Sequence, residues 1–303
     1  MDLRERFQGC LLGLATGDAV GTTVEFQSRG SFSPVIDMIG RGPFNLNPGE
    51  WTDDTSMALC LATSLIEVGE FDAADQMNRY CNWYERGYLS STGKCFDIGN
   101  TVRQALFEYK KSGNPFSGST NPLSAGNGCL MRLAPVPMFY FPHRDHILHF
   151  SGESSRTTHG ATECIDGNRL LGNILFQALS GASKIEILFE NNLEIILSPS
   201  IQAIASGKYR NQTIDQIHGT GYVVDSLEAA LWCFWTTESY EQAILKATNL
   251  GDDADTTSAI CGQVAGAYYG ISGIPAHWLR QLTMLNEITE LANQLYNASR
   301  KRY

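Results

Sequence analysis

Glycine recurs at every fourth position in two segments near opposite ends of the chain. In the first, residues 4–21, the apolar residues have helical spacing and the glycines are Gly9, Gly13, Gly17 and Gly21. The second, residues 255–270, repeats the spacing at Gly262, Gly266 and Gly270. Residues four apart lie on one face of a helix, where glycine lowers helix stability but admits another backbone. The two stripes therefore predict tight packing of two core helices.

Helical spacing of apolar residues also dominates the rest of the chain and predicts an all-α fold. Helices are expected over residues 4–20, 55–70, 72–86, 99–111, 145–157, 160–180, 191–206, 226–236, 239–248, 255–269 and 278–299. Residues 112–130 are rich in Gly, Ser, Asn and Pro and predict a loop. Strand patterns are weak, and the best candidate, residues 186–189, is ambiguous. No linker or repeat divides the chain, so one domain is expected over residues 1–303.

The composition limits the classes of partner. The formal net charge is −10, whereas nucleic acid and anionic membranes call for basic patches, so neither is expected as the main partner. Residues 1–6 are charged and lack the apolar region of a secretory signal, and no run of about 18 apolar residues predicts a membrane span. The eight cysteines are scattered, mostly in apolar stretches, as reduced core thiols are. We therefore expect a soluble, cytoplasmic protein. A monomer is also expected, although none of these features sets the oligomeric state.

Two short segments rich in carboxylates and hydroxyls each stand directly before a helical pattern. The first acidic box is residues 51–56 (Trp-Thr-Asp-Asp-Thr-Ser), and the second acidic box is residues 251–257 (Gly-Asp-Asp-Ala-Asp-Thr-Thr). Taken singly, each is explained by helix capping and by the preference of acidic residues for a helix N-terminus. Together, and without a neighbouring His or Cys, they favour hard cations such as Mg²⁺ or Mn²⁺. A fold that joins the two boxes would form a site for two such ions.

The second acidic box also matches the D-x-D-x-T pattern of phosphatases at Asp253, Asp255 and Thr257. That pattern follows a buried strand near the start of an α/β fold. Residues 242–250, which precede it here, have helical spacing instead. A metal-dependent phosphohydrolase is therefore the weaker interpretation.

Three single residues can each be interpreted either as a functional group or as a structural residue. Glu25 stands between apolar residues, where burial raises a carboxyl pKa and suits it to acid–base catalysis; the alternative is an ordinary loop glutamate. His159 stands at a helix break and is also explained as a structural histidine. Asp97 precedes a helix and is adequately explained as its N-cap.

Residues 124–132 form a glycine-containing segment that can approach a ligand closely. The glycines on either side of Asn127 free the backbone N–H groups to contact a phosphate or a ribose. Arg132 at its end can pair with a phosphate or with a structural carboxylate. Gly-Asn-Gly is also ordinary turn chemistry, so the segment alone does not identify a site.

In this order, these motifs resemble those of the ADP-ribosylglycohydrolase family. The resemblance covers nearly the whole chain and rests on Gly17-Asp18-Ala19, Glu25-Phe26, residues 52–55, Asp97-Ile98-Gly99, Gly126-Asn127-Gly128, Met131-Arg132, Thr158-His159-Gly160 and residues 222–230 and 253–256. It implies an all-α orthogonal bundle with a binuclear Mg²⁺ or Mn²⁺ centre in a cleft. It also implies a hydrolase that cleaves the glycosidic bond between ADP-ribose and a modified protein side chain, with ADP-ribose as product.

The resemblance further implies roles for individual residues. The implied metal ligands are Thr52, Asp53, Asp54, Asp253, Asp255 and Thr256. The implied substrate-binding residues are Asp97, Gly99, Gly126, Asn127, Gly128, Cys129, Met131 and His159. Glu25 matches a catalytically important glutamate. Two positions depart from the family pattern: Cys129 stands where a small residue, often Ser, is usual, and Asp252 stands where Gly is frequent.

The expected mechanism is that of a metal-assisted glycosidase. The implied ligands would hold a metal pair that could orient the 2′- and 3′-hydroxyls of the ribose distal to adenosine and offset charge in an oxocarbenium-like state. Asp54, or a water held by Asp53 and Asp255, supplies the base or nucleophile, and Glu25 acts as acid or orients the leaving group. The second acidic box, over Asp253-Ala254-Asp255-Thr256-Thr257, resembles that of the bacterial activating glycohydrolases, and this resemblance implies arginine as the acceptor.

Three alternatives remain within the resemblance. One is a hydrolase for serine-linked ADP-ribose. Another is an ADP-ribose-binding module without turnover, which the intact acidic boxes and Glu25 disfavour. A third is a toxin-immunity protein that also acts by occluding its partner.

Overall fold

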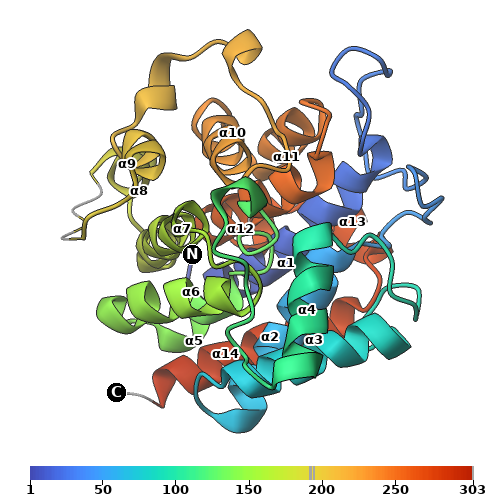
Figure 1. The fold of residues 1–303 in the computed structure, drawn as a ribbon. Helices are drawn as coiled ribbons and strands as arrows, with labels where there is room; N and C mark the ends of the chain where they lie inside the picture. Colours follow the sequence, from blue (N-terminus) through green and yellow to red (C-terminus); the bar gives the residue numbers. More distant parts are fainter. Residues whose placement is uncertain (191–192, 194, 302–303) are drawn as a thin grey trace.

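The computed structural model describes residues 1–190, 193 and 195–301, which form fourteen α-helices joined by loops and short 3₁₀ turns (Figure 1). The helices are α1 (Leu3–Gly21), α2 (Asp53–Val68), α3 (Ala73–Arg86), α4 (Asn100–Ser112), α5 (Pro135–Tyr140), α6 (Arg144–Thr158), α7 (Thr162–Ser180), α8 (Lys184–Phe189), α9 (Pro199–Ala205), α10 (Val223–Trp235), α11 (Tyr240–Thr248), α12 (Ala254–Tyr269), α13 (Ala276–Gln281) and α14 (Leu285–Arg300). Extended pairing in the described ranges is limited to three isolated bridges. The predicted all-α fold class is confirmed.

The central pair of helices is α1 and α12, which pack antiparallel along their glycine stripes (Figure 1). A Cβ atom on Gly13 would lie 2.3 Å from the carbonyl oxygen of Gly262. A Cβ atom on Gly17 would lie 2.3 Å from that of Ser258. Backbones this close leave no room for a side chain at the contact. The predicted tight packing is confirmed, and its register places the end of α1 beside the start of α12.

The start of α2 is held at the same place by a side chain of α1. Asp18 is fully buried, and its Oδ1 accepts hydrogen bonds from the backbone N–H (2.9 Å) and hydroxyl (3.0 Å) of Thr52. Its Oδ2 accepts from the N–H (3.0 Å) and hydroxyl (2.6 Å) of Thr55. These bonds satisfy N–H groups that the first turn of a helix leaves free. Three helix termini therefore meet: the end of α1 and the starts of α2 and α12.

The hydrophobic core surrounds this arrangement. The larger cluster of buried apolar residues includes side chains of α1, α2, α7, α10, α11 and α12, and a smaller cluster joins α2, α3 and α4. All eight cysteines are free thiols and six of them are buried, as expected for reduced core residues. None of the described helices is both long and apolar enough to span a bilayer.

The candidate strand at residues 186–189 is wrong, because these residues belong to helix α8. The Ser183 hydroxyl accepts a hydrogen bond from the N–H of Glu186 (3.3 Å). The Glu186 carboxylate accepts one from the N–H of Ser183 (2.7 Å). This capping box starts the helix. The Ser-x-x-Glu pattern of residues 183–186 is the sequence signal for this helix start.

The helix expected over residues 278–299 is two helices, α13 and α14. The chain turns at Met284, which has a φ of 56°. The N–H of Thr283 donates to the carbonyl oxygen of Gly49 (3.0 Å), and its carbonyl oxygen accepts from Trp51 Nε1 (3.2 Å). A tertiary contact with the segment around the first acidic box therefore interrupts the helix.

Two short helices also differ from expectation. Residues 191, 192 and 194 of the helix expected over 191–206 lie outside the described residues, and α9 begins at Pro199. Proline suits this first helical position because its missing N–H would be unpaired there. Helix α5 has six residues, too few for a periodic pattern, and was not predicted.

Candidate active site

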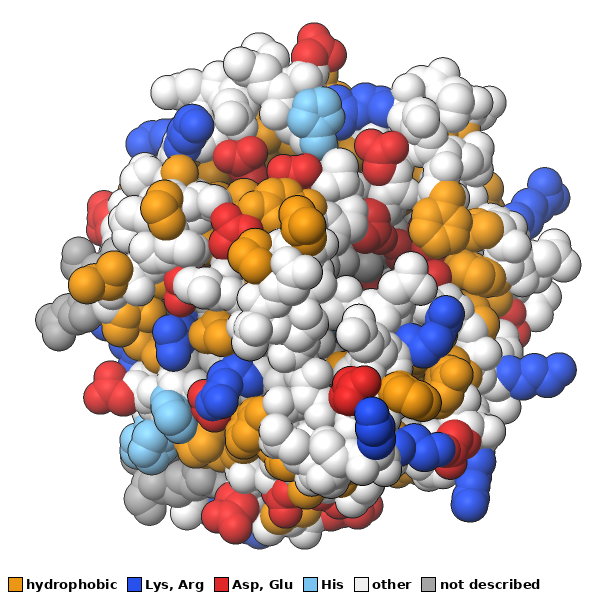
Figure 2. Space-filling view, viewed as in Figure 1, with side chains coloured by type: hydrophobic (Ala, Val, Ile, Leu, Met, Phe, Trp, Pro, Cys, Tyr) orange, Lys and Arg blue, Asp and Glu red, His pale blue; other side chains and the backbone are white. Residues whose placement is uncertain are grey.

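A cleft lies over the point where the three helix termini meet, with a cavity of about 380 Å³. Figure 2 shows acidic side chains inside a hollow on this face of the molecule. Most of the predicted site residues line the cavity: Glu25, Asp53, Asp97, Gly99, Gly126, Asn127, Gly128, Met131, His159, Asp253, Asp255 and Thr256. The fold thus brings together groups that are far apart in the sequence.

The two acidic boxes contact each other directly. The Thr52 hydroxyl, which also bonds to Asp18, lies 3.3 Å from Asp255 Oδ2. The Thr256 hydroxyl donates to Asp54 Oδ1 (3.2 Å). The convergence on which the predicted metal site depends is present, because the start of α2 faces the start of α12.

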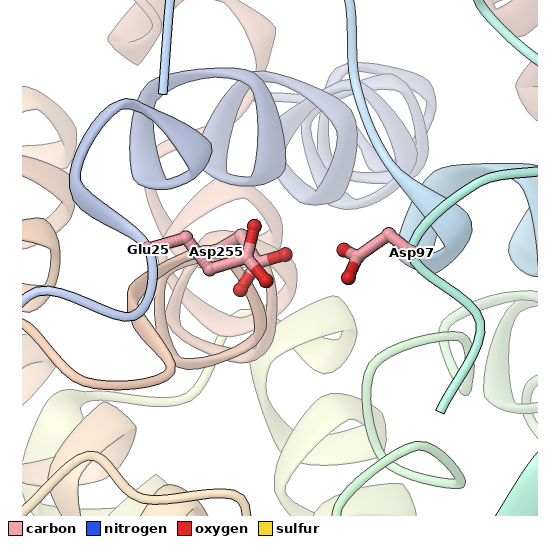
Figure 3. Close-up of side chains that lie close together, drawn as sticks. All are labelled: Glu25, Asp97 and Asp255. Atoms are coloured by element: carbon pink, nitrogen blue, oxygen red, sulfur yellow. The ribbon is translucent and has the colours of Figure 1, made fainter. Parts of the chain in front are cut away.

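Three carboxyl groups of the cleft form a compact cluster (Figure 3). Glu25, Asp97 and Asp255 each offer an oxygen, and these oxygens lie within 4.8 Å of one another. Glu25 and Asp255 come from the neighbouring ends of α1 and α12, and Asp97 points toward them from the loop before α4. Asp97 has a φ of 60°, a left-handed conformation that Asp adopts more readily than most residues. The N-cap of α4 is Gly99, so the interpretation of Asp97 as an N-cap is wrong.

Burial and mutual repulsion raise the pKa values of these carboxyls. Desolvation, followed by the charge of Asp253, raises the pKa of Glu25 to about 8. Desolvation and neighbouring carboxylates raise the pKa of Asp97 to about 11. The same two causes raise the pKa values of Asp54 and Asp255 well above their usual range. Several of these groups must hold protons unless a cation offsets their charge.

The donor set fits a hard divalent cation. The buried oxygens Asp54 Oδ2 and Asp255 Oδ1 have no hydrogen-bond partner in the described part of the chain. A buried carboxylate oxygen without a donor is costly unless a cation contacts it. The facing side chains of the two boxes offer only carboxylate and hydroxyl oxygens, the ligands that Mg²⁺ and Mn²⁺ prefer.

The glycine loop (residues 126–128) is attached to the second acidic box. Asn127 Nδ2 donates to Asp253 Oδ2 (2.7 Å) and to Ser226 Oγ (3.2 Å). Gln263 of α12 is buried and donates through Nε2 to the carbonyl oxygens of Leu130 (3.0 Å) and Met131 (2.9 Å). The loop therefore has a fixed position relative to the carboxylate cluster.

Three predicted site residues lie outside the cavity lining. Thr52 and Asp54 are buried, and their contacts are with Asp18, Asp255 and Thr256. Cys129 is fully buried, with its Sγ 3.8 Å from the carbonyl oxygen of Gly126. The Cys129 thiol thus lies against the glycine loop from the protein side.

Sequence reasoning assigned no role to Asp18 or Phe26. An ionisable residue within the glycine-rich apolar stretch of residues 9–21 was the signal for Asp18. Phe26 lines the cleft, is 67% exposed, and donates its N–H to the carbonyl oxygen of Asp252 (2.7 Å). Asp252 has a φ of 56°, which explains why glycine suits that position.

Fold and site together define an all-α protein with an oxygen-lined, acidic cleft between helix termini. The model of the ADP-ribosylglycohydrolase family matches residues 1–303, and the chain belongs to this family.

Similar proteins agree with the family assignment. The chain is 45% identical over 292 residues to "ADP-ribosylarginine hydrolase Tri1" of Serratia proteamaculans, covering 96% of this chain and 79% of the relative. It is 31% identical to "ADP-ribosyl-[dinitrogen reductase] glycohydrolase" of Rhodospirillum rubrum, covering 93% and 92%. A solved structure, "ADP-ribosylglycohydrolase-related protein complex", aligns with a TM-score of 0.88 at 42% identity and covers 98% of this chain and 99% of its own.

Proposed function

We propose that the protein is a divalent-cation-dependent hydrolase that removes ADP-ribose from arginine side chains of modified proteins. The observation that carries this proposal is the meeting of both acidic boxes beside Glu25 and the glycine loop. The name of the Serratia relative supports arginine as the acceptor, and that of the Rhodospirillum relative supports release of ADP-ribose from a protein.

Two Mg²⁺ or Mn²⁺ ions are proposed as the cofactor. The proposed ligands are Thr52, Asp53, Asp54, Asp253, Asp255 and Thr256. When bound, such ions orient vicinal hydroxyls and stabilise charge that develops in the transition state. The orphaned oxygens of Asp54 and Asp255 support this assignment.

The chain's own groups supply the proton transfers. In the cleft without a cation, burial, followed by the charge of Asp253, raises the pKa of Glu25 to about 8, so Glu25 holds a proton near neutral pH. We propose Glu25 as the acid that protonates the leaving nitrogen. The proposed nucleophile is a water held between Asp53 and Asp255, both of which line the cavity. Asp54, expected from the sequence as an alternative base or nucleophile, is buried outside the lining and is proposed here only as a cation ligand.

The substrate's diphosphate and ribose are proposed to bind across the cleft. The proposed contacts are Asp97, Gly99, Gly126, Asn127, Gly128, Met131 and His159. Cys129 supports the glycine loop from beneath in this proposal. We further propose that residues 1–303 act as one monomeric domain in the cytoplasm, where its free thiols stay reduced.

An assay of ADP-ribose release tests the proposal. The protein is incubated with arginine-, serine- and aspartate-linked ADP-ribosyl substrates, with and without a chelator. We expect release from the arginine-linked substrate, its loss on chelation and its recovery with Mg²⁺ or Mn²⁺. Asp255→Asn should abolish release. Asp252→Asn is the matched control, because the Asp252 side chain does not line the cavity and asparagine tolerates its positive φ.

The alternatives predict other outcomes. Release from the serine-linked substrate alone would change the acceptor. Tight binding of ADP-ribose without turnover would indicate a binding module, and inorganic phosphate as product would indicate a phosphohydrolase. A toxin partner that remains inhibited by an Asp53→Ala variant would indicate occlusion.

A further inference from the structure

Arg132 is fully buried behind the glycine loop and is held by neutral oxygens. Its Nη1 donates to the carbonyl oxygen of Gly128 (2.9 Å). Its Nη2 lies within hydrogen-bond distance of the Ser154 carbonyl oxygen (3.2 Å), the Thr157 hydroxyl (3.2 Å) and the Thr158 hydroxyl (2.7 Å). The bond to Thr158 is the shortest of these, so the main hydrogen bond of Nη2 is to that hydroxyl.

The guanidinium charge of Arg132 has no carboxylate partner. The Tyr80 ring covers it, with the guanidinium carbon 5.0 Å from the ring centroid. Among the described residues, no Asp or Glu oxygen lies within 4 Å of it. A buried charge that is not offset acts over a longer range than a paired one. Arg132 therefore makes this end of the cleft favourable for anions, in contrast to the carboxylate cluster.

The Thr158 hydroxyl connects Arg132 to the imidazole of His159. Thr158 Oγ1 lies 2.8 Å from His159 Nδ1. A guanidinium only donates, so Thr158 accepts from Arg132 and keeps its own proton for another partner. Nδ1 is the acceptor that the described neighbours offer to that proton. The Thr158 hydroxyl therefore donates to Nδ1, and the ring proton of neutral His159 is on Nε2.

The Nε2 edge of His159 lies beside the glycine loop in the cleft. A Cβ atom on Gly126 would lie 3.3 Å from Nε2, and one on Gly128 would lie 3.1 Å from Cε1. His159 is 2% exposed and lines the cavity, and no described protein group accepts a hydrogen bond from Nε2. Burial, followed by the charge of Arg132, lowers the pKa of His159 to about 3, so the ring is neutral.

We propose that Arg132 and Thr158 are positioning residues that lock His159 in the Nε2–H tautomer, so that Nε2 is a permanent donor to an anionic phosphate oxygen of the ligand. The glycines leave space for such an oxygen next to Nε2. The Arg132 charge favours an anion there, and the neutral ring donates without needing protonation. Identifying this oxygen with the diphosphate of ADP-ribose rests on the proposed function; the tautomer itself does not.

The first test observes the tautomer directly. Long-range ¹H–¹⁵N correlation spectra distinguish a protonated Nε2 from a protonated Nδ1, and the His159 ring is assigned as the signal missing from a His159→Gln variant. We expect Nε2–H in the unmodified protein and in Thr158→Ser, which keeps the hydroxyl. In Thr158→Val the hydroxyl is lost, and we expect both tautomers.

A matched variant distinguishes two roles of the Thr158 hydroxyl: fixing the tautomer of His159, and merely holding Arg132 in place. The Thr157 hydroxyl is also buried in α6 and also contacts Arg132 Nη2, but it does not contact the His159 ring. Thr157→Val should therefore leave the Nε2–H tautomer unchanged. A role that is only structural predicts that Thr157→Val and Thr158→Val behave alike.

The second test measures ADP-ribose affinity by calorimetry. Only the Nε2–H fraction of His159 can donate to the phosphate, so Thr158→Val should weaken binding by the reciprocal of that fraction, ~2-fold when the two tautomers are equally populated. Thr158→Ser and Thr157→Val keep the Nε2–H tautomer and should bind ADP-ribose as tightly as the unmodified protein. Equal losses in the two valine variants would overturn the proposal.

The spectrum of the unmodified protein tests the proposed tautomer even if a variant does not fold. A proton on Nδ1 of its His159 would overturn the tautomer lock. If Nε2–H is observed but ADP-ribose does not bind, the lock stands and the proposed function fails.

Discussion

Individual carboxyl groups in and beneath the cleft have different neighbours and therefore suit different tasks. Asp54 and Asp255 have orphaned buried oxygens, which is appropriate for groups that contact a cation. Glu25 accepts a weak hydrogen bond from the Thr22 hydroxyl (3.4 Å) and has a pKa raised to about 8, which is appropriate for an acid. The sequence indicated both kinds of residue but not this difference in surroundings, because burial is a tertiary property.

Glu25→Gln tests the acid. We expect kcat to fall ~10²-fold or more, because glutamine cannot supply the proton. Mn²⁺ affinity measured by calorimetry should change little, because the proposed ligands are intact. Glu290→Gln, on the exposed face of α14, is the control and should keep full activity. Unchanged turnover in Glu25→Gln with metal retained would show that Glu25 is not the acid.

Asp18→Asn tests the link between α1 and α2. Asparagine offers one acceptor oxygen to groups that now donate to two carboxylate oxygens, so we expect a loss of about 3 kcal/mol in the free energy of unfolding. Urea denaturation measures it. Asp2→Asn is the control: Asp2 caps α1 at an exposed site by accepting from Glu5 N–H (2.8 Å), and asparagine caps equally well. Equal stability of the two variants would contradict the importance of Asp18.

At the level of elements, the site depends on the register of α1 against α12. A Cβ atom on Gly21, the last residue of α1, would lie 2.5 Å from the carbonyl oxygen of Ala254, the first residue of α12. Because the end of α1 contacts the start of α12, Glu25, which follows α1 by four residues, lies next to Asp255. The glycine spacing predicted tight packing, but no local pattern specified the partner or the register.

Gly13→Ala tests that packing. The added methyl group would meet the Gly262 carbonyl oxygen at 2.3 Å, and a backbone oxygen cannot move aside as a side chain can. We expect a loss of about 3 kcal/mol or more in the free energy of unfolding. Gly167→Ala in α7 is the control: its nearest contact is an ordinary 3.4 Å, so alanine should be neutral or stabilising by up to about 1 kcal/mol. Thermal and urea denaturation of both variants measure the difference.

Most helices were predicted close to their observed bounds because their apolar spacing is strong over three or more turns. The errors have particular causes. At 186–189 the capping box at Ser183 was overlooked, although the sequence contains it. The break at Met284 was not visible locally, because it depends on the contact of Thr283 with Gly49 and Trp51.

Across the whole molecule, negative charge is concentrated in the cleft as well as spread over the surface. Folding brings carboxyls of both chain ends into one buried cluster (Figures 2 and 3). The resulting repulsion destabilises the cation-free protein, and the divalent cation proposed above would offset it. Cation binding and stability are therefore expected to be linked.

The linkage predicts a pH dependence with a definite sign. The pKa values of Glu25 and Asp97 are raised to about 8 and about 11, so the folded state binds protons more tightly than the unfolded state, whose carboxyls titrate near ~4. Stability of the chelated protein should therefore be highest at acidic pH and fall as pH rises from about 4 through 8. Calorimetric melting temperatures between pH 5 and 8 measure this decrease.

Mg²⁺ or Mn²⁺ should raise the melting temperature more at pH 8 than at pH 5, because protons compete with the cation for the same carboxyls. Asp255→Asn removes one crowded carboxylate, so its chelated form should show a shallower decrease with pH. A melting temperature of the chelated protein that rises from pH 5 to 8 would contradict the crowding.

The sequence alone determined the helical class, the presence of two tightly packed core helices, and which segments are rich in carboxylate and hydroxyl side chains, because spacing and side-chain chemistry act over a few neighbouring residues. Tertiary structure alone decided that Asp18 caps α2, that Asp97 joins Glu25 and Asp255, and that Cys129 and Asp54 lie outside the cavity lining. These outcomes depend on the register of α1 with α12 and on burial. Both are set by contacts between residues far apart in the chain, and no local pattern contains them.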